Sequence, residues 1–142
     1  FSIGIFMTYI GGLLGDKYGP IKIIRLSLLV WLPAMFLLTE VTTFSPLIMM
    51  PVAYLLLLMI GAAKAISYSP VIVLGQTYLA KSIGFASGIT LGVSQTIGGV
   101  IAPVVGNLAD TYSLPVAMMT LVPFLVMGLG ASLILKDPKK LQ

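Results

Sequence analysis

The chain of 142 residues is 58% hydrophobic and only 8% charged, with a mean hydropathy of +1.11 and a formal net charge of +4. Soluble domains carry roughly 25% charged residues, so a chain this poor in charge cannot cover its surface with ions, and its expected solvent is lipid. Histidine and cysteine are both absent, which excludes disulfides and thiol chemistry and removes most zinc, copper and haem sites, so we expect no cofactor and no metal.

The first apolar run covers residues 1–14 and has neither a basic region before it nor a cleavage pattern after it. We expect it to be the end of a truncated span whose beginning precedes this sequence. The polar, Gly-rich segment Gly15–Pro20 predicts a turn, and Pro20 suits the first position of a new helix. The second predicted span covers 20–39, and Glu40 ends it.

The third run is too long for one simple span. After a short loop at 41–45 we predict a span over 46–68, and the apolar sequence continues to residue 80. A helix from 47 to 80 would be ~51 Å long, whereas the hydrocarbon core of a bilayer measures ~30 Å. We therefore predict a kinked extension to residue 80 that begins at Pro70, with a single long and tilted helix as the alternative.

Two further spans are predicted at 84–106 and 115–135, with Asp110 between them. About 20 apolar residues cross a bilayer as a helix, and none of the runs shows the polar alternation of a barrel strand. The predicted fold is therefore an all-α integral membrane protein, a single transmembrane helix bundle over residues 1–142.

Charge predicts the orientation of this bundle. If the spans alternate, Glu40 and Asp110 lie on one side with no basic residue, and Lys64 stays unassigned. The other side then holds seven basic residues: Lys17, Lys22, Arg25, Lys81, Lys136, Lys139 and Lys140. By the positive-inside rule we expect a multi-pass protein of the cell (inner) membrane with a cytoplasmic C-terminus. Because these residues lie scattered at the ends of apolar runs, we expect no nucleic-acid partner.

A short pattern occurs twice, as GLLGDKYG at Gly12–Gly19 and as GNLADTYS at Gly106–Ser113. Each copy follows one predicted span and precedes another, and the predicted topology places the two copies on opposite sides. Inverted-topology repeats of transporters leave such pairs behind. The alternative is that Gly/Asp turns are simply common between spans.

The first copy resembles the signature loop of the major facilitator superfamily, which reads roughly Gly-x-x-x-Asp-Arg/Lys-x-Gly-Arg-Arg/Lys. The positions that match are Gly12, Asp16, Lys17 and Gly19. The basic pair that should follow is replaced by Pro20 and Ile21, which favours the degenerate second-half copy of the loop. The segments 76–88 and 98–110 resemble the loop before the eleventh helix and the end of that helix, and the combination is closest to the fosmidomycin-resistance-like branch.

The resemblance implies the eighth to twelfth helices of a proton-coupled transporter, a drug-efflux antiporter that works by alternating access. The partners it implies are the lipid bilayer, the missing N-terminal half of the same transporter and a small-molecule substrate. No carboxylate falls in the middle of a predicted span, so a proton carrier is expected outside this sequence. The alternatives are uptake rather than export, or a non-catalytic membrane scaffold or receptor. No enzyme is expected, because the chain offers no mid-span acid, histidine or cysteine.

Three polar residues are candidates for the substrate pathway. Lys64 is the one charge inside a long uncharged stretch, and Tyr68 follows one helical turn later. Gln95 lies ~17 Å along a helix from Gly84, near the expected midplane. The alternative for Lys64 is a lysine that extends its side chain to the inner interface.

Two glycine-containing groups complete the candidates. Gly12, Asp16, Lys17 and Gly19 are the expected cytoplasmic gating loop, in which Asp16 is either a latch or a helix cap. A glycine stripe is expected to pack closely against another helix. It consists of Gly84, Gly88, Gly92, Gly99 and Gly106.

Overall fold

The computed structural model describes residues 2–41 and 46–135, and nearly all of them are helical. The elements are α1 (Ser2–Tyr18), α2 (Pro20–Glu40), α3 (Pro46–Tyr78), a short 3₁₀ helix η2 (Ala80–Ser82), α4 (Ile83–Thr111), α5 (Leu114–Met119) and α6 (Val122–Ile134). Within the described ranges there is no strand, and four helical segments are long and apolar enough to cross a membrane. The predicted all-α membrane bundle is therefore confirmed.

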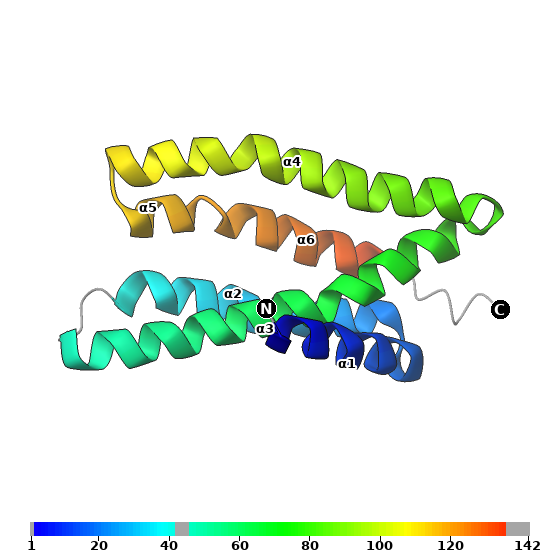
Figure 1. The fold of residues 1–142 in the computed structure, drawn as a ribbon, viewed down its shortest axis with the longest axis horizontal. Coiled ribbons are helices and arrows are strands. Elements are labelled where there is room, and N and C mark those ends of the chain that lie inside the picture. Colours follow the sequence, from blue (N-terminus) through cyan, green and yellow to red (C-terminus); the bar gives the residue numbers. More distant parts are fainter. Residues whose placement is uncertain (1, 42–45, 136–142) are drawn as a thin grey trace.

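The helices form two groups, which the end of α3 connects (Figure 1). In the first group, α1 and α2 both pack against α3. In the second group, α4 and α5–α6 run above them, and α6 packs on α2. The last turns of α3 rise towards η2 and α4, which joins the two groups (Figure 1).

The core between α2 and α3 is apolar. Ala34, Val41 and Leu56 are buried together, and partly buried aliphatic side chains surround them. The two buried hydroxyls on α2 bond to backbone carbonyls of their own helix, Ser27 to Ile24 at 2.9 Å and Thr39 to Phe36 at 2.7 Å. Such bonds satisfy a polar group where lipid offers no partner, so α2 can bury these side chains at membrane depth.

The turn predicted over Gly15–Pro20 is wrong in extent. α1 continues to Tyr18, and Gly19 is the only residue between α1 and α2. Its φ is 98°, a conformation that residues with a Cβ avoid, so glycine suits this position. Its N–H donates to the carbonyl of Gly15 at 2.9 Å, and Pro20 begins α2 as predicted.

Proline affects the third and fifth predicted spans differently. α3 stays one helix to Tyr78 with Pro51 and Pro70 inside it, so the extension beyond residue 68 is continuous with the span. The fifth span is divided at Thr120–Leu121 into α5 and α6. Pro123 explains the division, because its ring clashes with the carbonyl of Met119, the last residue of α5, and it has no N–H to donate.

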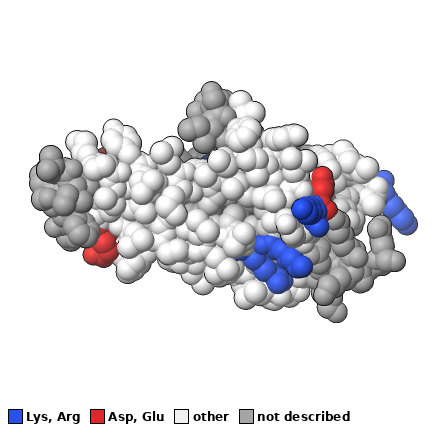
Figure 2. All heavy atoms as spheres, turned by 90° about the horizontal axis from the view of Figure 1, so that it is seen from below, with Lys and Arg blue, Asp and Glu red and all other residues white. Residues whose placement is uncertain are grey.

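Basic side chains gather at one end of the bundle. Figure 2 shows them towards the end where α1 meets α2, with acidic surface beside them, and further acidic surface at the opposite end. Lys17 lies in the last turn of α1 and Lys81 lies in η2, whereas Glu40 ends α2 and Asp110 lies in the last turn of α4. The expected loop at 42–45 and the basic residues 136, 139 and 140 lie outside the described ranges.

Candidate functional site

Lys64 and Tyr68 line one hollow between α1 and α3, with a volume of about 510 Å³. Its other lining residues are small or apolar, with one hydroxyl: Gly4, Ile5, Thr8, Gly61 and Ala65. Because glycine and alanine have little or no side chain, the backbones of both helices form part of the wall of the hollow. Lys64, Tyr68 and Thr8 supply its polar side chains. The structure thus brings two of the three pathway candidates together.

The depth of this hollow follows from the helix lengths. α2 has 21 residues and is therefore ~31 Å long, which equals the thickness of the hydrocarbon core. Its N-terminal end adjoins Gly19, and Thr8 lies eleven residues before Gly19 in α1, or ~17 Å along the helix. Because Thr8 and Lys64 line the same hollow, an interface at the level of Gly19 would put Lys64 at about half the depth of the span.

Lys64 is exposed to the hollow and has no acidic neighbour there. Within residues 2–41 and 46–135 it forms no ion pair, and none of the residues that line the hollow is an Asp or a Glu. Thr8 bonds back to the carbonyl of Gly4 at 2.9 Å, so its hydroxyl proton is already used. The ammonium group of Lys64 is therefore the dominant charge of this site.

Gln95 lies on a different surface, the exposed face of α4. The hollow on this face measures about 440 Å³ and lies open. Its lining consists of Phe85, Gly88, Ile89, Gly92, Val93, Thr96 and Ile97. Gln95 is absent from both hollows, so these described helices do not bring it together with Lys64 and Tyr68.

Among the described residues, α4 contacts the other helices only near its two ends. Near its start, the Nε2 of Gln76 donates to the hydroxyl of Ser87 at 2.8 Å, and a Cβ added at Gly75 would lie 2.6 Å from the hydroxyl oxygen of Thr90. Its other end packs against α5. Among the described elements, α4 comes within a Cα–Cα distance of 8 Å of neither α6, α2 nor α1. The middle of α4 is therefore left uncovered.

The glycine stripe of α4 faces open space. A Cβ added at any of its members would meet no atom within 4 Å; these are Gly84, Gly88, Gly92, Gly99 and Gly106. Within the part of the chain that the structure describes, the stripe packs against no other helix. The close packing expected of the glycine stripe therefore stays a prediction, and its partner helix would lie outside the described residues.

Close helix packing occurs instead at glycines of α1, which the sequence interpretation did not select for this role. A Cβ at Gly11 would lie 2.7 Å from the carbonyl carbon of Ile66, and one at Gly15 would lie 3.2 Å from the Cγ of Pro70. The spacing of four residues between these glycines was a usable signal, because small residues at this spacing let membrane helices approach closely.

The four residues of the expected gating loop are mostly not in a loop. Gly12 lies inside α1, where an added Cβ would lie 3.1 Å from the hydroxyl of Ser69, and Asp16 and Lys17 occupy the exposed last turns of α1. The Nζ of Lys17 lies 5.3 Å from the ring centroid of Tyr18. Gly19 is the N-cap of α2 and, as a glycine, makes no side-chain capping bond, so the roles of Asp16 as latch or cap stay predictions.

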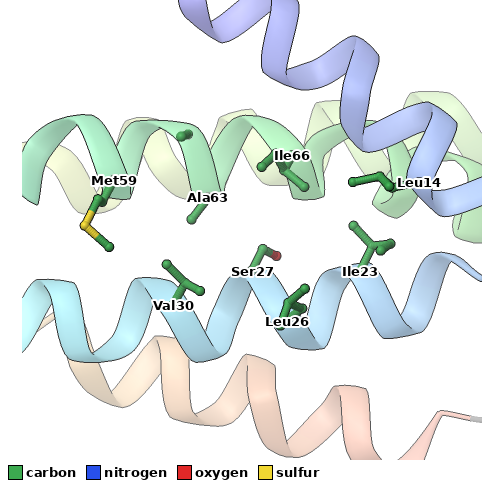
Figure 3. Close-up of a pocket in the computed structure, with 9 residues that line it drawn as sticks. Leu14, Ile23, Leu26, Ser27, Val30, Met59, Ala63 and Ile66 are labelled. Atoms are coloured by element: carbon green, nitrogen blue, oxygen red, sulfur yellow. The ribbon is translucent and has the colours of Figure 1, made fainter. Parts of the chain in front are cut away.

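Two further cavities are apolar. The cavity drawn in Figure 3 measures about 240 Å³, and side chains of α2 and α3 point into it from both sides, among them Val30 and Ala63. The hydroxyl of Ser27 at its wall is bonded to its own helix. A second cavity of about 340 Å³ lies between α2, α3 and α5. Neither offers a charged side chain, so of the four hollows and cavities described here, the one between α1 and α3 alone has a charged lining residue, Lys64.

The chain is 31% identical over 136 residues to the "Uncharacterized MFS-type transporter YfnC" of Bacillus subtilis (strain 168). The match covers 96% of this chain but 32% of the relative, so the chain spans about a third of the length of the curated relative that it matches. No family model and no solved structure matches the chain. A similarity to a membrane transporter, together with four apolar helical segments, indicates that this chain is part of a multi-pass membrane protein.

Proposed function

We propose that this chain belongs to a secondary transporter of the major facilitator superfamily and supplies part of its C-terminal half. The observation that carries the proposal is the match to an MFS-type transporter over 96% of the chain. The signature-like residues at Gly12–Gly19 and the helical bundle agree with it. We propose that the chain corresponds to the eighth to twelfth helices, closest to the fosmidomycin-resistance-like branch. The reason is that the signature-like segment Gly12–Gly19 lacks the basic pair that follows it in the first half of the family.

The proposed activity is movement of a small organic solute by alternating access, in the direction of efflux and coupled to protons. Alternating access needs two bundles that move about a shared site. The uncovered middle of α4 is the surface on which we expect the missing N-terminal half to pack, with Gly88 and Gly92 at the contact. Without that half, the chain has one bundle and no closed pathway.

Within this activity, Lys64, Tyr68 and Gln95 are the proposed substrate-pathway residues. Lys64 and Tyr68 share the hollow, and Gln95 lies on α4 ~18 Å along the helix from Ile83, a distance that supports a position near the midplane. Asp16 and Lys17 at the basic end are the proposed gating pair, with Asp16 as a latch. The basic end is proposed to be cytoplasmic, on the charge rule alone.

The test is solute flux by the complete protein in sealed liposomes, with and without an imposed proton gradient. We expect gradient-dependent movement of a drug-like solute by the complete protein and none by the 142-residue chain alone. Lys64→Met and Gln95→Leu should each reduce flux without reducing the amount of folded protein, and Val126→Leu on α6 is the control. Flux by the isolated chain, or wild-type flux in both variants, would contradict the proposed mechanism.

A further inference from the structure

Lys64 presents an uncompensated positive charge at the depth of a membrane. It is the one charged residue between Glu40 and Lys81, and it lies in α3 fourteen residues before the end of that helix at Tyr78. If the inner interface lies at the level of Gly19, the distance along α1 places the hollow ~17 Å from that interface, about half of a ~30 Å hydrocarbon core.

The side chain is too short to leave this depth. A lysine stem has four carbons and reaches ~6 Å, well short of either interface. A lysine that faces lipid at mid-depth is costly, so such residues face a water-filled cavity or a partner of opposite charge. Within the described residues, no Asp or Glu lines the hollow and Lys64 forms no ion pair. The compensating negative charge therefore lies outside the described residues, and the open hollow gives a molecule that enters it direct access to the ammonium group.

The remaining walls suit a small organic solute. Tyr68 lies one turn beyond Lys64 on the same face of α3, and its hydroxyl is a second donor beside the ammonium group. Gly4, Gly61 and Ala65 leave space, while Ile5 and the ring of Tyr68 supply apolar surface. A volume of about 510 Å³ lies within the range of ligand sites in proteins.

We propose that the hollow between α1 and α3 binds the carboxylate, phosphonate or sulfonate group of a small organic anion, with Lys64 as its positive partner and Tyr68 as a hydrogen-bond donor. This assignment rests on the proposed transport function, and it names the class of substrate. Organic cations are disfavoured in the same hollow, because Lys64 repels them.

The charge preference can be measured without knowing the substrate. The 142 residues contain no cysteine, and Gly61 lines the hollow at a position where an added Cβ meets nothing within 4 Å. In the purified complete protein, with any cysteine outside this chain replaced, Gly61→Cys would be reacted with two methanethiosulfonate probes of similar size. One probe carries a sulfonate and the other a trimethylammonium group.

We expect the sulfonate probe to react faster, and Lys64→Met to lower the anion-to-cation rate ratio by at least about tenfold, since the lost charge acts on the two probes with opposite sign. Lys64→Arg should restore the ratio, and Lys64→Gln is a second neutral variant that keeps a polar side chain. Cysteine at Ser82, exposed in η2, should give a ratio that does not depend on residue 64.

An unchanged ratio at Gly61→Cys in both neutral variants would overturn the proposal. So would a failure of both probes to react there, because the hollow would then be closed to solutes. If transport is absent but the ratio depends on Lys64, the anion site stands and the proposed function fails. If transport is present but the ratio does not depend on Lys64, the anion site fails alone.

Discussion

The guanidinium of Arg25 in α2 donates two hydrogen bonds to the backbone carbonyl of Ser132 in α6, from Nε at 3.0 Å and from Nη2 at 2.6 Å. The same Nη2 approaches the carbonyls of Leu133 at 3.4 Å and Leu135 at 3.3 Å. The last carbonyls of a helix have no partner within the helix, and its C-terminal end favours a cation. Arg25 therefore caps α6 and joins it to α2.

Arg25→Met should destabilise the bundle by about 1–3 kcal/mol, because the carbonyl of Ser132 is buried and loses a charged donor. Arg25→Lys should recover only part of the lost stability, since an ammonium group cannot reproduce the forked donor geometry of a guanidinium. Lys22→Met, at an exposed position in the same helix, is the control. The measurement is the thermal unfolding midpoint of the purified complete protein. Equal midpoints for Arg25→Met and Lys22→Met would show that the cap contributes nothing.

Gly11→Ala should separate α1 from α3, because its methyl group would lie 2.7 Å from the carbonyl carbon of Ile66 and the obstacle is backbone. Overpacking of this kind costs about 1–3 kcal/mol. Gly4→Ala, in the same helix but with nothing within 4 Å of the added Cβ, should be tolerated. Size-exclusion profiles of the detergent-extracted protein would compare the two. A normal profile and midpoint for Gly11→Ala would refute the close contact.

Gly92→Leu should reduce the folded amount of the complete protein if the uncovered face of α4 packs on the missing half. Among the described residues a Cβ added at Gly92 meets nothing within 4 Å, so we attribute any damage to a surface outside them. Gly130→Leu on α6 has equally open surroundings and is the matched control. Equal membrane abundance of the two variants would indicate that the α4 face contacts lipid.

Cysteine at Thr111 should react with a membrane-impermeant thiol reagent added outside intact cells, whereas cysteine at Ser82 should not. Thr111 ends α4 near the acidic end, and Ser82 ends η2 beside Lys81 at the basic end. The expectation follows from the positive-inside rule. Labelling of Ser82→Cys in place of Thr111→Cys would reverse the orientation of the whole bundle.

Sequence patterns predicted the fold class because lipid imposes a strong constraint: every backbone polar group must be bonded internally, so long apolar runs become helices. The pattern was misleading at Gly15–Pro20, where polar residues indicated a turn. Asp16 and Lys17 can remain helical because they lie at the end of the span, where charged side chains reach water. The fifth span was predicted as one run over 115–135, and its division before Pro123 was not predicted, since how far a helix opens at a proline depends on its neighbours.

The candidate site was less accessible to prediction. The glycines of α1 and those of α4 share a spacing of four residues, yet only those of α1 contact a neighbouring helix within the described chain. Spacing reveals that a surface can be approached closely, but it does not identify the partner. Likewise, Lys64 was recognisable in the sequence by its isolation, whereas only the structure shows that Thr8 of α1 lines the same hollow.

The single-residue connection at Gly19 has a consequence for how the polypeptide enters the bilayer. With no slack between them, α1 and α2 have to insert together as a helical hairpin. The connection also fixes the rotational phase of α2. One residue added to or removed from its start would turn the rest of the helix by ~100° about its axis. Such a change would carry Ile23 and Ser27 away from α3 and present them to the acyl chains, so the length of this segment should tolerate less variation than its composition.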